Sequence, residues 1–225
     1  SFSFSGHYHK GFTDAKKDGI SFTAAQALCE DPFRFIIVDI DKNGASSFEM
    51  HQLKNPEGLD LTDFHIHTDL AYCNENMNVA KVIALKKMMG LSNAAFSEHS
   101  GHLYYDKSIY YSGKYIYEDP EKACDNRFPL YFQRLEEAGN EMLRGIEIDN
   151  AAHGRAIITK EHFGAFKVRI GAVHQLSELM KPEFDRDAVI SEFMIVMDNF
   201  IKSGINILAH PFRVFRRANL EIPSE

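Results

Sequence analysis

Residues 63–69, Asp-Phe-His-Ile-His-Thr-Asp, place two histidines at the end of a short apolar run. Side chains alternate across a β-strand, so His65 and His67 point to the same side and can reach one metal ion. A His-x-His pair by itself is more often hydrogen-bonded or solvated than metal-bound. Whether this pair belongs to a metal site therefore depends on what the rest of the chain supplies.

The same arrangement recurs downstream, where short apolar runs end in residues that can bind a metal and helical segments follow. We expect the strands at residues 61–65, 93–97, 142–148, 167–173 and 205–209. Helical spacing, closed each time by a glycine, predicts helices at 79–89, 127–138 and 185–202. Strands that alternate with helices are typical of a parallel α/β fold.

The longest helical segment is expected to begin at Asp185, a residue type that caps helix N-termini. Its predicted buried face comprises Val189, Phe193, Met194, Met197 and Phe200.

Polar residues gather at the carboxyl ends of the predicted strands, which is where active sites lie in closed barrels of this type. These strand-end residues are His65, His67, Glu98, His99, Glu147, His174 and His210. Their regular placement favours metal binding by the His-x-His pair over a hydrogen-bonded or solvated pair. It predicts a metal centre.

Five stretches around these residues, DFHIHT, FSEHS, GIEID, GAVHQL and LAHPF, follow one another in this order. With them the chain resembles the PHP (polymerase and histidinol phosphatase) family over about Leu59 to Glu225. The resemblance implies an α/β fold, a distorted TIM-like (β/α)7 barrel, with two or three divalent metal ions. It also implies hydrolysis of a phosphoester on a small phosphorylated metabolite or nucleotide.

The resemblance assigns roles to the strand-end residues. The metal ligands that it implies are His65, His67, His99, Glu147, His174 and His210. The first two would bind one ion, Glu147 would bridge this ion and a second one that His174 and His210 complete, and His99 would belong to a third site. Glu147 and His210 are also expected to take part in catalysis.

The residue types suit this chemistry independently of the family. Neutral imidazoles bind zinc, iron or manganese, while a bridging carboxylate offsets the charge between two ions. Such ions, about 3.5–4 Å apart, lower the pKa of a shared water and give a metal-bridging hydroxide that can attack phosphorus.

Two departures from the family pattern bear on the number of ions. An Asp-x-His motif normally supplies ligands from the last strand, but none follows His210. Either this motif lies beyond Glu225, so that the barrel lacks its last unit in this chain, or the site is incomplete, and we expect the first. The segment after the first motif offers Asp69, Cys73 and Glu75, and none of them is a clear match for the further ligand that many members have there.

Substrate recognition is expected from two segments near these strand ends. Residues 101–118 read as one long loop with six tyrosines, either a packed insertion or a lid that stacks on the organic part of the substrate. Arg213 and Arg216 follow the last predicted strand and could clamp a phosphate group. Three further histidines, expected in loops or beside the metal ligands, are His102, His153 and His162.

Residues 1–57 form an N-terminal extension before the main domain, 58–225, with the boundary at the turn residues 55–58. We expect a short helix at Ser21–Cys29 and a β-hairpin from 33–40 and 45–53. Asp39-x-Asp41-x-Asn43 resembles half of a calcium loop, but the hairpin turn explains it better. His7 and His9 form another His-x-His pair, which we expect on the surface or packed in a strand.

Composition narrows the class of protein. The 225 residues carry a net charge of -7, which disfavours an extended grip on nucleic acid. The apolar runs are too short for a transmembrane helix, so no membrane partner is expected. Three scattered cysteines indicate a reducing, cytoplasmic compartment, although the first residue is Ser and an export signal could have been removed. The alternative to an enzyme is a non-catalytic metal-binding barrel that acts as a scaffold or interaction module.

Overall fold

The computed structural model describes residues 2–5, 12–24, 34–43, 46–52, 60–74, 76–123 and 126–220. The internal contacts of the chain divide it into two units, Ser1–Leu59 and Asp60–Glu225. The boundary expected after residue 57 lies close to this division. Each unit is described by itself below.

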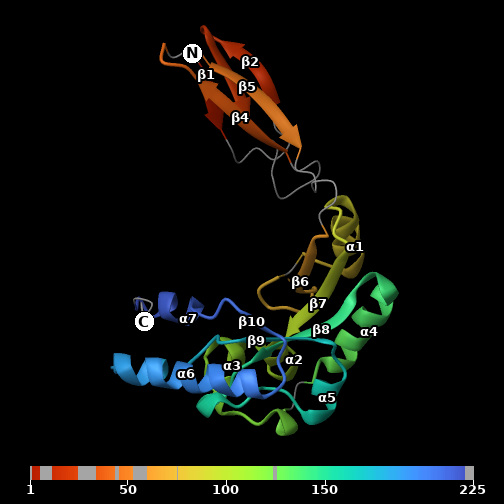
Figure 1. Ribbon diagram of the computed structural model, residues 1–225, viewed down its shortest axis with the longest axis vertical. Helices are drawn as coiled ribbons and strands as arrows, with labels where there is room; N and C mark the ends of the chain where they lie inside the picture. The colour runs from red at the N-terminus through yellow and green to blue at the C-terminus, as the bar shows by residue number, and fades with distance from the viewer. Residues whose placement is uncertain are drawn as a thin grey trace. The chain divides into compact units, whose positions relative to one another are not determined.

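The larger unit is built on a five-stranded parallel sheet that curls into a half-barrel (Figure 1). Its strands are β6 (Thr62–Ile66), β7 (Asn93–His99), β8 (Leu143–Asp149), β9 (Val168–Ala172) and β10 (Ile207–Ala209). They lie in the order β10-β9-β8-β7-β6, which follows the chain without a reversal. Doubly wound sheets reverse their strand order at a switch point, whereas barrels do not. The predicted α/β class with parallel strands is thus confirmed.

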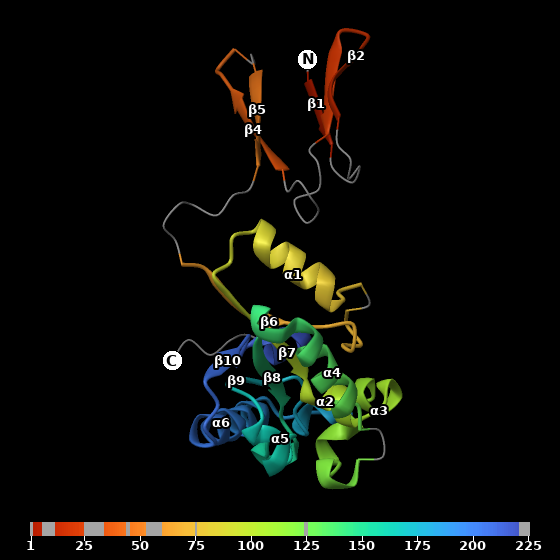
Figure 2. The same ribbon diagram turned by 90° about the vertical axis from the view of Figure 1, so that its right-hand side faces the viewer.

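Helices connect the strands of this sheet (Figure 2). α1 (Val79–Met88) lies between β6 and β7, α4 (Phe128–Ala138) between β7 and β8, α5 (Lys160–Gly164) between β8 and β9, and α6 (Arg186–Lys202) between β9 and β10. Asp185 caps α6 as predicted, since its carboxylate accepts a hydrogen bond from the Ala188 amide. Within the described residues, none of the helices combines the length and apolar character needed to cross a membrane.

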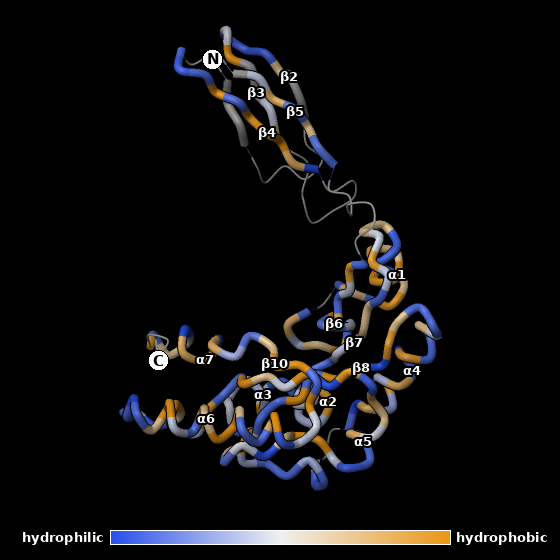
Figure 3. Tube along the Cα trace, in the orientation of Figure 1, coloured by the Kyte–Doolittle hydropathy of each residue, from blue (hydrophilic) through white to orange (hydrophobic). Residues whose placement is uncertain are grey.

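The buried face of α6 differs from the prediction at three positions: Val196, which was not predicted, is buried, Met197 is only partly buried, and Met194 is exposed. The fully packed side chains are Val189, Phe193, Val196 and Phe200. They are spaced i, i+4, i+7 and i+11, which keeps them on one stripe of the helix. Met194, predicted to be buried, is rotated off this stripe by one residue and is 59% exposed. Apolar and polar residues accordingly alternate along α6 in Figure 3.

The tyrosine-rich segment is not the long loop that the sequence suggested. It forms α2 (Ser100–Tyr104), α3 (Lys107–Tyr111) and the 3-10 turn η1 (Lys114–Tyr117). Asp106 starts α3 by accepting hydrogen bonds from the amides of Ser108 and Ile109. Four tyrosines, Tyr104, Tyr105, Tyr110 and Tyr115, are buried in the core. Most of the segment is therefore a packed insertion.

The described residues of the N-terminal unit form strands and turns, and none of them lies in a helix. β1 (Phe2–Ser5), β3 (Ile20–Ala24) and β2 (Phe12–Lys17) form one sheet in this order, and β4 (Arg34–Ile40) pairs antiparallel with β5 (Ser46–Gln52). The second pair is the predicted hairpin. His7 and His9 lie outside the described residues.

The helix predicted at Ser21–Cys29 is wrong over residues 21–24, which belong to strand β3. The reason is the preceding turn. Asp18 and Gly19 have φ of 53° and 73° and join β2 to β3 as a two-residue hairpin loop. An Asp-Gly pair favours this turn, whose twist matches that of the flanking strands. Residues 25–29 lie outside the described part of the chain.

Candidate metal centre

The parallel sheet brings the predicted ligands together at one edge. Because all five strands run in the same direction, the residues at their carboxyl ends meet there. Glu147 on β8 occupies the middle, and none of its side chain is exposed.

Five imidazoles surround the Glu147 carboxylate. The distances from a ring nitrogen to a carboxylate oxygen of Glu147 are 2.9 Å for His99, 3.2 Å for His65 and His210, 3.5 Å for His174 and 3.6 Å for His67. All six metal ligands implied by the family resemblance thus lie in one cluster.

Three groups in this cluster could each hold a metal ion, because their ligand atoms lie within 4.8 Å of one another. The groups are His65, Glu147 and His210; His99, Asp149 and His174; and His67, Cys73 and His99. His65 is thereby grouped with His210, and not with His67 as the sequence suggested. Two residues that the sequence did not assign, Asp149 and Cys73, join the set.

The contact between His99 and Glu147 fits a shared metal ion better than a hydrogen bond. Nδ1 of His99 and Oε2 of Glu147 are 2.9 Å apart, yet neither atom has a partner in hydrogen-bonding geometry among the described residues. A buried polar atom without a partner costs about 1–3 kcal/mol. An ion between the two atoms would satisfy both, so the donor set fits a bound metal.

The charge states of two central residues also suit metal binding. Burial would raise the pKa of Glu147, but the imidazoles around it, His99 foremost, hold this pKa well below its usual value. Burial and the nearby His99 lower the pKa of His67 to about 3. Glu147 is therefore a carboxylate and His67 a neutral imidazole, the forms that bind metals.

His99 would exchange a proton for a metal. Burial by itself lowers the pKa of its ring, but the Glu147 charge and a contact with Cys73 outweigh burial and raise this pKa well above its usual value. A divalent ion beside Glu147 would supply the positive charge that the protonated ring otherwise provides.

A β-bulge positions the first histidine. Thr62 pairs with Asn93, but Ile66 pairs with Phe96, so β6 contains one extra residue between these pairs. Bulges often occur next to active sites, where they redirect a side chain. Here the irregular segment includes His65.

Backbone conformation is unusual at the last histidine. His210 follows β10 with a φ of 30° and precedes Pro211. Non-glycine residues rarely adopt this left-handed region, which costs about 1–3 kcal/mol. His210 and His65 each have Nε2 3.2 Å from Oε1 of Glu147, so one of these two contacts comes from a strained residue.

Glu98, a predicted strand-end residue, supports the centre without belonging to any of the three groups. Its Oε2 accepts hydrogen bonds from the amide and hydroxyl of Thr68, at 3.0 and 2.5 Å. Its Oε1 lies 3.6 Å from Nδ1 of His67. Glu98 therefore holds the segment that follows β6, and burial raises the pKa of this carboxyl.

Asp149 is a functional candidate that the sequence reasoning missed. It lies two residues after Glu147 on β8, so both side chains project from the same face of the strand. Its Oδ1 is 2.7 Å from His174 Nδ1 and accepts a hydrogen bond from the Tyr110 hydroxyl at 2.8 Å, while its Oδ2 accepts one from the Gly101 amide at 2.8 Å. Burial would raise its pKa, but His174 keeps it well below the usual value. The alternation of residues along β8 was the signal that could have found it.

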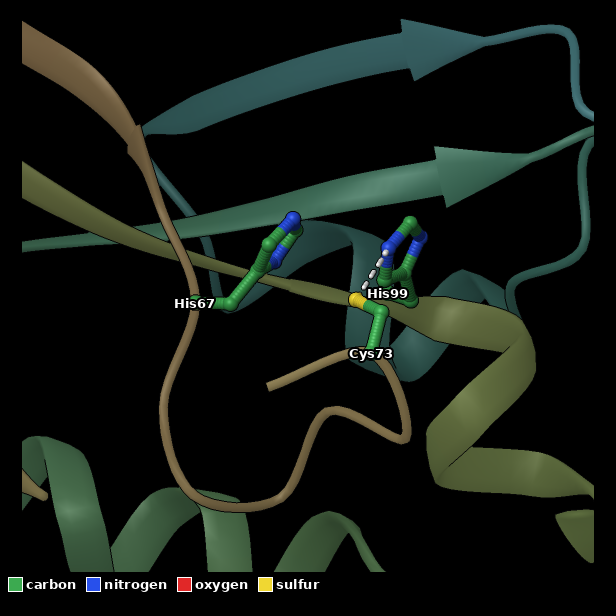
Figure 4. Close-up of side chains that lie close together, drawn as sticks. All are labelled: His67, Cys73 and His99. Carbon is green, nitrogen blue, oxygen red and sulfur yellow. Dashed lines mark hydrogen bonds between the residues drawn. The ribbon is translucent and has the colours of Figure 1, made fainter. Parts of the chain in front are cut away.

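The three residues considered as the further ligand after His67 have different outcomes. Sγ of Cys73 is 3.6 Å from Nε2 of His99 (Figure 4). Asp69 instead forms a two-point ion pair with Arg134, with both contacts at 3.0 Å. Glu75 lies outside the described residues.

A cavity of about 690 Å³ opens beside the cluster. Its walls include His67, Cys73, His99, His102, Tyr110, Tyr111, Tyr115, His174, Gln175 and Arg213. Arg213, the first residue of α7 (Arg213–Arg217), is exposed and lines the cavity. Arg216 is exposed on the same helix but is not among the described residues that form the wall. Of the two predicted arginines, Arg213 therefore lines the cavity and Arg216 is not among its lining residues.

His102 is the one of the three additional histidines that reaches the cavity. Its Nδ1 accepts a hydrogen bond from the Tyr72 amide at 3.2 Å, and its backbone carbonyl accepts one from Arg127. A neutral ring whose Nδ1 accepts carries its proton on Nε2. His162 instead contacts the Tyr104 hydroxyl and stacks on a phenylalanine of α4. Neither His162 nor His153 belongs to the metal-ligand groups.

Comparison with known proteins found no match to a protein-family model, a curated protein or a solved structure.

Proposed function

We propose that this chain is a metal-dependent phosphoesterase that acts on a small phosphorylated metabolite or nucleotide. One observation carries the proposal: a single buried carboxylate, Glu147, has a nitrogen of five imidazoles within 3.6 Å. Structural metal sites are usually closed by four ligands. A shared carboxylate among this many donors is instead typical of centres with two or more ions, which often hydrolyse phosphoesters.

The half-barrel supports a distorted PHP-type (β/α)7 barrel as the complete architecture. Its strands follow chain order, and the candidate ligands all lie at the carboxyl edge of the sheet. Both features are those of barrel enzymes. The further strands of such a barrel would continue the sheet beyond its edges.

Two or three ions would occupy the centre, with zinc, manganese and iron as the candidates for this mixture of nitrogen and oxygen donors. His65, His210 and Glu147 would hold one ion, and His99, Asp149 and His174 would hold another. Such ions, when bound, lower the pKa of a water molecule and neutralise charge on a phosphoryl group.

The protein itself would orient the ligands. Asp149 accepts a hydrogen bond from the Nδ1–H group of His174. The lone pair of this ring is then on Nε2, which lies 3.5 Å from Glu147. Asp149 is in turn held by Tyr110 and by the Gly101 amide. If Asp149 binds an ion directly, these two donors would still fix its position.

Donors on the cavity wall would bind the phosphoryl group. Arg213 offers a guanidinium, and His102 offers the proton on Nε2. Tyr111, which is 57% exposed and also lines the cavity, offers an aromatic face to the organic part of the substrate. These donors would share the cavity lining with the candidate ligands His67, His99 and His174.

A phosphatase assay on purified protein tests the proposal. We expect hydrolysis of p-nitrophenyl phosphate in the presence of zinc, manganese or iron, its loss on chelation, and its recovery when metal is returned. Glu147→Gln and His65→Ala should each lower the rate by at least about 100-fold, more than the loss of a residue that only orients a ligand. His51→Ala, in strand β5 of the other unit, is the matched control and should keep the wild-type rate.

The absence of hydrolysis by metal-replete protein would overturn the proposal. Metal binding that is stoichiometric and depends on Glu147, without turnover, would instead favour the non-catalytic scaffold. Metal content should therefore be measured by elemental analysis on the same samples.

A further inference from the structure

Cys73 differs chemically from every other residue in the cluster. The loop after β6 directs its sulfur toward the His99 ring, while His67 lies beside both residues (Figure 4). One ligand atom from each of the three lies within 4.8 Å of the others. Cys73 is exposed, whereas His99 is only 5% exposed. The group therefore spans from the buried cluster to the cavity.

The two nitrogens of His99 face different groups. Nδ1 lies 2.9 Å from Oε2 of Glu147, and Nε2 lies 3.6 Å from Sγ of Cys73. One ring nitrogen has one lone pair and binds one ion. An ion bound by Cys73 and Nε2 would thus be distinct from any ion bound beside Glu147.

Thiolate and carboxylate ligands favour different metals. Thiolates are soft donors that suit zinc and its substitute cobalt, whereas manganese and magnesium prefer oxygen. Three protein ligands also leave a fourth position of a tetrahedral ion open. At Cys73 this position would face the cavity, since Cys73, His67 and His99 all line it.

We propose that Cys73 and His99 Nε2, together with His67, form a separate metal site that binds zinc-like ions and discriminates against manganese and magnesium. Because Cys73 is exposed, an ion here exchanges with solvent more readily than one beside the buried Glu147. The site would let the protein hold one class of ion in the deep cluster and another at the cavity. If both ions bind through His99 at once, its ring must release both nitrogen protons to solvent, so that Nδ1 and Nε2 each offer a lone pair. The site would take the third ion of the proposed centre, and its preference for zinc-like ions does not depend on the phosphoesterase activity.

Cobalt(II) titration of the whole chain tests the site by spectroscopy. Wild-type protein should develop a sulfur-to-cobalt charge-transfer band in the near ultraviolet and bind one cobalt more per chain than Cys73→Ser. The Cys124→Ser protein is the matched control and should keep both the band and the stoichiometry. With manganese, the wild type and Cys73→Ser should bind the same number of ions.

A wild-type protein without the band, or a Cys73→Ser protein that retains it, would overturn the proposal. So would an equal gain of manganese and cobalt through Cys73. None of these results depends on turnover, so they are distinguishable from a failure of the phosphatase assay.

Protection from alkylation gives a second readout that needs no substitution. Zinc should slow the reaction of Cys73 with iodoacetamide, measured on its peptide by mass spectrometry, whereas manganese at the same concentration should not. Equal alkylation rates with and without zinc would contradict a zinc–thiolate bond. Because this measurement uses the native sequence, a folding defect in Cys73→Ser cannot account for the result.

Discussion

The floor of the centre and its rim are built differently. On the floor, Glu147 and Asp149 are completely buried, and several fixed groups contact each carboxylate. On the rim, Cys73 and Arg213 are exposed, and each depends on a loop or a short helix for its position. Buried, multiply held ligands are suited to binding ions in one geometry. Exposed side chains that line the cavity are suited to discriminating between the ions or substrates that bind there.

The largest effect is expected for Asp149→Asn, which changes one of the two buried carboxylates on the floor and should lower zinc affinity. The amide keeps the shape of the side chain but removes the charge that holds the His174 proton. Zinc affinity should fall by about 10- to 100-fold, as it does when outer partners of metal ligands are lost. Competition with a chromophoric chelator measures this change.

Asp106→Asn is the control for this substitution, because Asp106 caps α3 on the surface and should leave zinc affinity unchanged. Unchanged affinity in Asp149→Asn would show that the floor does not depend on this carboxylate. Loss of a whole ion per chain would identify Asp149 as a direct ligand.

An intermediate effect is expected on the rim. Arg213→Ala should raise KM for a phosphomonoester about tenfold with little change in kcat, because one charge-assisted hydrogen bond to the phosphoryl group is lost. Metal content should remain at the wild-type level. Arg216→Ala, on the same helix but away from the cavity wall, is the matched control. Equal KM values for the two variants would remove Arg213 from the substrate site.

The smallest effect on zinc affinity is expected for Tyr110, which donates one hydrogen bond to the buried Asp149. Tyr110→Phe removes a donor to Asp149 but leaves the Gly101 amide in place. Zinc affinity should fall by about 2- to 10-fold, which corresponds to one hydrogen bond. Tyr117→Phe, at a position that is 57% exposed, should not change it. A larger loss for Tyr110 than for Asp149 would reverse the proposed order of support.

Local patterns in the sequence predicted much of the fold. The cap at Asp185 and the apolar runs before His65, Glu147 and His210 depend on neighbouring residues, and the structure places helices and strands there. The same locality explains the errors. Helical spacing did not separate Met194 from the true stripe, and the Asp18-Gly19 turn was overlooked.

The centre was predicted in part, because spacing identifies strand ends but not what meets across them. The His–Glu cluster follows from parallel strands that end together. The proximity of Cys73 to His99 depends on how a loop folds back. The pairing of Asp69 with Arg134 joins residues that are 65 positions apart. Such long-range partners leave no local signal, whereas Asp149, two residues after Glu147, did leave one.

The chain order of the strands has a consequence for biosynthesis. The first ligand is on β6 and the last follows β10, so a growing chain presents four of the histidines before His210 has been made. N-terminal segments fold first during synthesis, and parallel pairings between distant strands form slowly. The candidate ligands of the described residues therefore come together only late in synthesis, and metal that is present at that stage would find all five histidines of the cluster.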